Sequence, residues 1–239
     1  MPAPDLQVNV SIQKVGKHAS AKSGDTAEIV ERGDGGFSVV LVDGQGSGRG
    51  AKALSLLISA RAVSLLKDGM RDRAAVEGVH DFLLAHRNGL ISATVDIVTL
   101  TPRNHSLVLT RQSSVPAAID TGNGFEILAC ESGPIGRWNG REPWCYAHPA
   151  VNGLRLIVTT DGVAGAGARG TRPPLNIAEL ANHMSPEMVT ANEIAECVLN
   201  EAIRRENDRP ADDLTVVALT VAPAPKEPGR RMMALSVPL

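Results

Sequence analysis

The chain has 239 residues and a formal net charge of −2 from 24 basic and 26 acidic residues, with 43% hydrophobic and only 3% aromatic residues. This composition predicts one large domain, or one domain with tails, whose core is built from aliphatic side chains. The balanced charge argues against a nucleic-acid-binding surface or a basic membrane face. No apolar run approaches the ~18 residues that indicate a membrane-spanning helix.

The N-terminal residues and the cysteines indicate a cytoplasmic protein. The first five residues are polar and lack the apolar core of a signal peptide. Cys130, Cys145 and Cys197 are odd in number and widely spaced, so they form neither a disulfide framework nor a zinc pattern. We therefore expect reduced cysteines inside a cytoplasmic domain.

The first third of the chain predicts strands that end in acids. Residues 6–14 alternate apolar and polar side chains, as a half-buried strand does, and residues 26–31 predict a second strand. A glycine-rich hairpin turn then leads into an apolar strand that ends at Asp43. Asp25 and Asp43 are therefore expected at the same end of two neighbouring antiparallel strands.

The remainder of the chain predicts two pairs of helices separated by strands. Apolar residues recur at helical spacing in 50–67, 73–87, 177–183 and 191–205. Short β-favouring runs, most of them bounded by turn residues, occupy 94–101, 106–111, 116–120, 125–130, 144–148, 154–160 and 214–221. We expect one domain over residues 1–221 and a proline-rich tail over 222–239.

The order of these elements decides the fold class. Strands, two helices, strands, two helices and a strand lack the strict alternation of a parallel doubly wound sheet. The pattern favours an α+β protein, and this number of strands favours two stacked sheets. We therefore predict a four-layer α-β-β-α sandwich of two antiparallel sheets flanked by helices.

Four acids share a position at the junction between a strand and a turn: Asp25, Asp43, Asp161 and Asp212. An Asp-Gly pair alone often makes only a tight turn or a helix cap, so the argument depends on these strand ends converging. Converging carboxylates repel one another and normally require cations. An all-oxygen ligand set suits Mg²⁺ or Mn²⁺, and two such ions can activate a water molecule against a phosphoryl group.

The segments around these acids also resemble a known family. Ser23-Gly24-Asp25, Asp43-Gly44-Gln45-Gly46, Thr160-Asp161-Gly162 and Asp212-Asp213-Leu214-Thr215 match, in order and spacing, the metal-dependent protein phosphatase 2C superfamily. The likeness is greatest to its SpoIIE-type branch and covers about residues 20–221. A chain this short, with no sensor domain before the catalytic part, resembles the stand-alone stressosome phosphatases of that branch.

The resemblance implies the family's α-β-β-α sandwich and a site with two metal ions, Mn²⁺ or Mg²⁺. Asp43 would bridge both ions, and the Gly44 carbonyl would bind the second. Asp161 and Asp212 would complete the first metal. The activated water would then attack phosphorus in line, without a covalent enzyme intermediate.

Two further residues receive roles from the resemblance. Asp25 would orient the water between the metals, and Asp213 would support Asp212 in the metal set. The animal members hold the substrate phosphate with an upstream arginine that has no convincing match here. The basic residues in that region are Lys14, Lys17 and Lys22.

The implied function is a metal-dependent serine/threonine protein phosphatase that acts on a phosphorylated protein, with a STAS-domain regulator of a bacterial stress or sigma-factor pathway as its expected partner. The alternative is a pseudophosphatase that binds a phosphorylated regulator without turning it over. A histidine-kinase-type ATPase would need an upstream helix with a metal-binding Asn, where a hairpin is predicted here. A haloacid-type phosphatase would need a second Asp where Gln45 stands.

Overall fold

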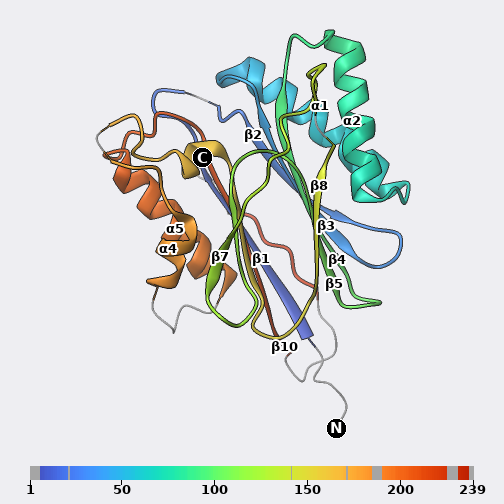
Figure 1. Ribbon diagram of the computed structural model, residues 1–239, viewed down its shortest axis with the longest axis vertical. Helices are drawn as coiled ribbons and strands as arrows, with labels where there is room; N and C mark the ends of the chain where they lie inside the picture. The colour runs from blue at the N-terminus through green and yellow to red at the C-terminus, as the bar shows by residue number, and fades with distance from the viewer. Residues whose placement is uncertain are drawn as a thin grey trace.

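Two antiparallel sheets stacked face to face form the middle of the molecule (Figure 1). The structure is a computed structural model that describes residues 6–20, 22–140, 142–170, 172–184, 190–224 and 231–236. Sheet A has the order β1 (Leu6–Val15), β10 (Leu214–Pro223), β9 (Arg155–Thr159), β6 (Ala117–Asp120), β7 (Phe125–Leu128). Sheet B has the order β2 (Asp25–Glu31), β3 (Phe37–Gly44), β4 (Ala93–Thr101), β5 (Ser106–Gln112), β8 (Trp144–Pro149).

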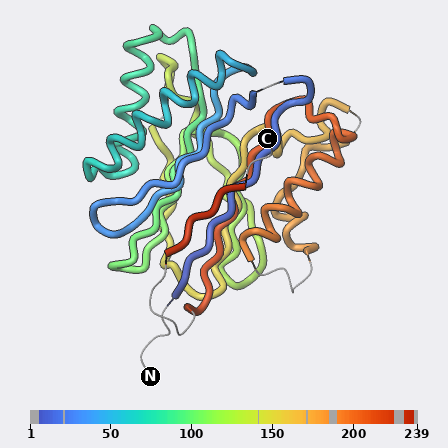
Figure 2. The backbone as a smooth tube through the Cα atoms, turned by 180° about the vertical axis from the view of Figure 1, so that it is seen from behind, coloured from blue at the N-terminus to red at the C-terminus, as the bar shows by residue number. Residues whose placement is uncertain are grey.

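Helices cover the outer face of each sheet, as Figure 2 also shows from behind. The pair α1 (Gly48–Lys67) and α2 (Asp72–Arg87) packs on sheet B. The helices on sheet A are α3 (Asp161–Ala164), α4 (Ile177–Asn182) and α5 (Ala191–Arg205). The expected α-β-β-α sandwich is confirmed.

Strand β3 shows why the apolar runs are continuous. Val39 and Leu41 point into the layer between the sheets, whereas Val40 and Val42 pack against α1 and α2. Successive side chains of a strand point to opposite faces, so a strand covered on both faces must be apolar throughout. The same burial holds β3 rigidly in the sheet up to the acid at its end.

Strand register brings the acidic junctions to one end of the sandwich. In sheet B, Asp25 is the direct partner of Asp43. In sheet A, Thr159 of β9 is paired with Val216 of β10, so the end of β9 lies beside the start of β10. Asp161 follows β9 and Asp212 precedes β10, which places them at neighbouring strand ends.

The structure adds details at the C-terminal side. Strand β10 continues to Pro223, beyond residue 221, and the division into a domain and a tail stays a prediction. Arg231 donates a hydrogen bond to the Gly35 carbonyl at 2.8 Å, while Met232 and Leu235 are exposed. No helix within the described part of the chain combines the length and the apolar character needed to cross a membrane.

Candidate active site

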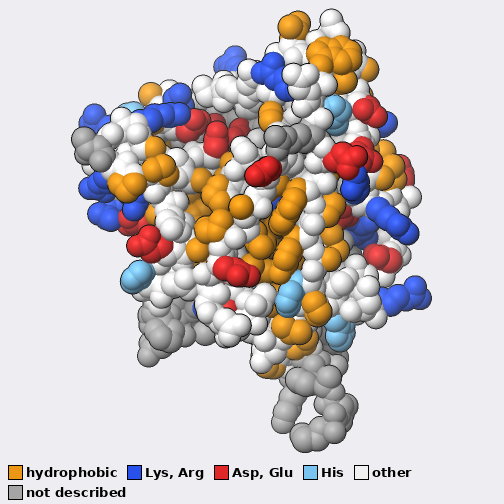
Figure 3. All heavy atoms as spheres, in the orientation of Figure 1, with side chains coloured by type: hydrophobic (Ala, Val, Ile, Leu, Met, Phe, Trp, Pro, Cys, Tyr) orange, Lys and Arg blue, Asp and Glu red, His pale blue; other side chains and the backbone are white. Residues whose placement is uncertain are grey.

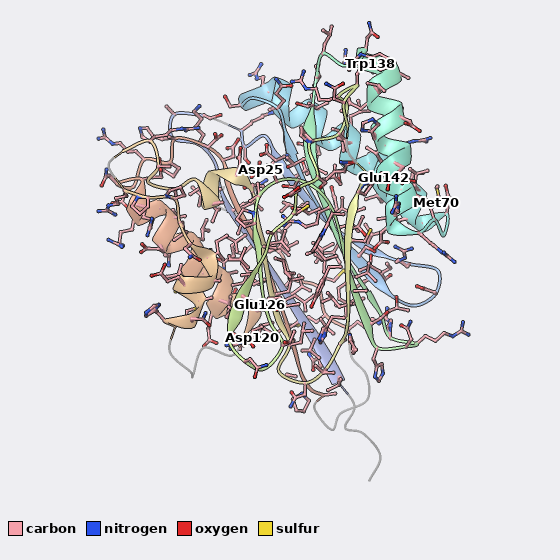
Figure 4. All side chains as sticks on the ribbon, viewed as in Figure 1. Asp25, Met70, Asp120, Glu126, Trp138 and Glu142 are labelled. Atoms are coloured by element: carbon pink, nitrogen blue, oxygen red, sulfur yellow. The ribbon has the colours of Figure 1, made fainter. Side chains whose placement is uncertain are left out.

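Asp25 links the two sheets at the end of the sandwich where the acids meet. It lies between the sheets, near α3 (Figure 4), and is almost completely buried. Its Oδ2 atom accepts hydrogen bonds from the hydroxyl groups of Thr160 at 3.0 Å and Thr215 at 2.5 Å. Both threonines belong to sheet A and Asp25 begins β2 of sheet B, so these bonds bring the acids of the two sheets together. Burial raises the pKa of Asp25 to about 6.

Asp43 lies within the electrostatic reach of the other acids. Burial, together with the charges of Asp25, Asp161 and Asp212, raises the pKa of Asp43 to about 9. The carboxyl groups of Asp43 and Asp161 are close enough to shift each other's pKa. Burial and the nearby Asp212 raise the pKa of Asp161 as well. The convergence expected from the sequence is therefore present for these four carboxylates.

Asp213 is buried and occupies a different position from Asp212. Its Oδ1 accepts a hydrogen bond from the Lys17 amide at 2.8 Å, and its Oδ2 accepts one from the Gly24 amide at 2.6 Å. Both oxygens thus hold the segment that leads to Asp25. Asp212 accepts a hydrogen bond from the Asp213 amide through Oδ1 at 3.1 Å and pairs with Arg169 through Oδ2.

Glycines at this end let backbones approach one another closely. A Cβ on Gly44 would lie 2.5 Å from the Ala51 carbonyl oxygen of α1, and one on Gly162 would lie 2.1 Å from the Asp213 carbonyl oxygen. Real Cβ atoms do not come this close to backbone oxygens, so both positions require glycine. The absent side chains at these two positions therefore make room for the protein's own backbone.

The donor set fits hard cations, although the carboxylates are held by protein groups in this structure. Among the described residues, no three His, Cys, Asp or Glu side chains are arranged ready to hold a metal ion. Two of the carboxylates already have partners: Asp25 accepts hydrogen bonds from threonine hydroxyls, and Asp212 accepts one from the Arg169 guanidinium. The chemistry of this donor set suits Mg²⁺ or Mn²⁺, because every donor is an oxygen and a cation would offset the crowded carboxylates.

Several residues of the site received no role from sequence reasoning. Thr160, Thr215 and Arg169 contact the acids, and two lysines reach the Asp25 carbonyl: Lys14 at 3.0 Å and Lys52 at 2.7 Å. The threonines could have been suspected, because each lies beside a predicted acidic junction. Lys17 takes part through its backbone amide, not through its charge.

A four-layer sandwich with carboxylates gathered at one end of both sheets is the architecture of the phosphatase 2C class. In solved structures, the phosphatase 2C domain of SpoIIE from Bacillus subtilis, with a fragment of its regulatory domain, has a TM-score of 0.80 to this chain. That match is 21% identical and covers 92% of this chain and 64% of the other. RsbX in complex with magnesium has a TM-score of 0.68 at 15% identity, covering 92% of this chain and all of RsbX (100%).

The chain belongs to the SpoIIE family. Its residues 33–222 match the family model described as Stage II sporulation protein E. Stage II sporulation protein E of Bacillus subtilis is 21% identical over 215 residues, which cover 90% of this chain. The chain spans 26% of the length of that relative. The predicted SpoIIE-type branch is thereby confirmed, and the fold is that of the phosphatase 2C domain of SpoIIE.

Proposed function

We propose that the chain is a metal-dependent protein phosphatase that hydrolyses phosphoserine or phosphothreonine. The observation that carries this proposal is the bonding of Asp25 of sheet B to Thr160 and Thr215 of sheet A. It joins the acidic ends of both sheets into one site. Membership of the SpoIIE family supports the same function.

The residues take the following roles in the proposal. Asp43, the Gly44 carbonyl, Asp161 and Asp212 would hold two Mn²⁺ or Mg²⁺ ions, which would supply an activated water as the nucleophile. Asp25 would orient that water, because its carboxylate is fixed by two hydroxyl groups.

Asp213 belongs to the proposed metal set as a supporting residue. Its bonds to two backbone amides hold the segment before Asp25 and fix the start of β10 at the same time. Positioning of this kind matters because small displacements of ligands lower metal affinity and activity.

The proposed substrate is a phosphorylated STAS-domain regulator of a bacterial stress or sigma-factor pathway. This proposal is supported by the likeness of the chain to RsbX and to SpoIIE, which is described as a cell fate determinant. This step rests on family analogy and not on a side chain of the site. A cytoplasmic location goes with such a partner.

One assay tests the function and separates it from the pseudophosphatase alternative. The purified protein is incubated with a phosphoserine STAS-domain protein and with an unrelated phosphopeptide, each with Mn²⁺ or with a chelator. We expect release of phosphate only with Mn²⁺, and faster release from the STAS-domain protein. Binding of the phosphoprotein without phosphate release would favour the pseudophosphatase, and equal rates on both substrates would contradict the proposed partner.

A further inference from the structure

Arg169 is bound to a proposed metal ligand. It lies in the loop that follows α3, and its Nη2 atom donates a hydrogen bond to Asp212 Oδ2 at 2.9 Å. Its Nη1 atom donates a second hydrogen bond to the Ala211 carbonyl oxygen at 2.6 Å. One guanidinium group therefore holds two successive residues of the segment that leads into β10.

The surroundings leave this guanidinium open to solvent. The Arg169 side chain is 62% exposed and that of Asp212 is 30% exposed. Figure 3 shows Lys and Arg side chains gathered over the end of α5 and the loops beside it, next to Asp and Glu side chains. An exposed ion pair of this kind adds little to folding stability, so its position suggests a different role.

A divalent ion bound by Asp212 Oδ2 would compete with Arg169 for that oxygen atom. A metal ion held by Asp161 and Asp212 would place two positive charges next to the guanidinium, and like charges at this distance repel. The guanidinium of Arg169 is bound directly to the carboxylate of Asp212. In the absence of a metal ion, Arg169 thus supplies part of the positive charge that the carboxylates require.

We propose that Arg169 is a displaceable counter-ion of Asp212 that binds the substrate phosphoryl group once a metal ion has taken its place. This inference rests on the proposed phosphatase function. A guanidinium group can donate two parallel hydrogen bonds to a phosphoryl group, which makes arginine well suited to this role. Arg169 would thereby supply the phosphate contact that the animal members take from an upstream arginine.

The test compares Arg169→Gln with Arg204→Gln as a matched control. Arg204 lies on α5, is 66% exposed and also donates two hydrogen bonds, both to the Glu201 carboxylate, at 2.7 and 2.8 Å. Glutamine keeps a polar side chain and removes the charge in both variants. Circular dichroism establishes that each variant is folded, as expected for exposed positions.

Two binding measurements, neither of which requires turnover, give the result. In calorimetric titration, Arg169→Gln should bind Mn²⁺ about fivefold more tightly than the wild type, the lower end of typical couplings between two sites. In the Mn²⁺-loaded protein, it should bind inorganic phosphate roughly tenfold more weakly, as expected for a lost charge-assisted contact. Arg204→Gln should match the wild type in both titrations.

The outcomes separate this inference from the function on which it rests. Unchanged or weaker Mn²⁺ binding by Arg169→Gln would show that Arg169 does not compete with the metal. Unchanged phosphate binding would remove its role toward the substrate. If the wild type itself binds no Mn²⁺, the proposed phosphatase function falls together with the inference.

Discussion

Replacing Asp43 by asparagine should lower kcat/KM for a phosphoserine peptide by about 10³-fold or more, because the bridging ligand of both proposed metal ions is lost. Asparagine keeps the size of the side chain, so β3 and its pairing with β2 should remain intact. The measurement is phosphate release with saturating Mn²⁺ for the wild type and the variant.

The matched control for this experiment is Asp81→Asn. Asp81 is an exposed acid on α2, so the same chemical change there should leave turnover within error of the wild type. A folded Asp43→Asn protein with near-normal turnover would show that the site has been assigned to the wrong carboxylate.

Replacing Arg111 by methionine should cause the largest loss of stability. Arg111 and Asp96 are direct partners on β5 and β4, and their side chains are 0% and 4% exposed. Two hydrogen bonds, at 2.8 and 3.0 Å, join the guanidinium to both carboxylate oxygens. The variant leaves a buried carboxylate without its counter-charge, which costs about 3–5 kcal/mol. For a domain of this size the melting temperature should fall by ~6–20 °C.

A double variant tests whether the lost pairing is the cause. Asp96→Leu combined with Arg111→Met removes both charges and should recover most of the stability, since an apolar pair can replace a buried ion pair. Thermal denaturation followed by circular dichroism measures both proteins. The explanation would be contradicted if the single variant had the melting temperature of the wild type, or if the double variant had a lower melting temperature than the single variant.

The sequence predicts the part of the fold that local patterns determine. The glycine-rich hairpin turn between two predicted strands indicated that Asp25 and Asp43 are neighbours, and the structure pairs them directly. Helix α3 was missed, because its four residues are too few to display a helical period. The pairing of Asp96 with Arg111 was not foreseen either, because a charged residue in a strand normally faces solvent.

The contacts that build the site are the part that local patterns do not determine. Asp25 meets Thr215 across 190 positions of sequence, and Arg169 meets Asp212 across 43. Contacts between residues so far apart in the sequence depend on how the two sheets stack. No turn or periodicity in the sequence encodes that stacking. The resemblance of the motifs predicts which acids bind the metal ions, but it did not predict that the Arg169 guanidinium binds Asp212.

Calorimetric melting with and without Mn²⁺ tests whether the four carboxylates form a metal site. Ions that bind only the folded protein stabilise it by ~2.7 kcal/mol at a hundred times their dissociation constant. This corresponds to a rise in melting temperature of about 5–11 °C for the wild type. Asp43→Asn should lose most of that rise, and Asp81→Asn should keep it.

The melting temperature in chelator provides a second readout of the same measurement. Burial and the neighbouring acids raise the pKa of Asp43 to about 9 in the folded protein, whereas the unfolded value is 3.8. Between these values the unfolded state releases the proton more readily, so Asp43 destabilises the fold progressively as the pH rises. Asparagine removes this effect, and Asp43→Asn in chelator should melt no lower than the wild type at neutral pH. An equal rise in melting temperature with Mn²⁺ in the wild type and in Asp43→Asn would contradict the metal site built around Asp43.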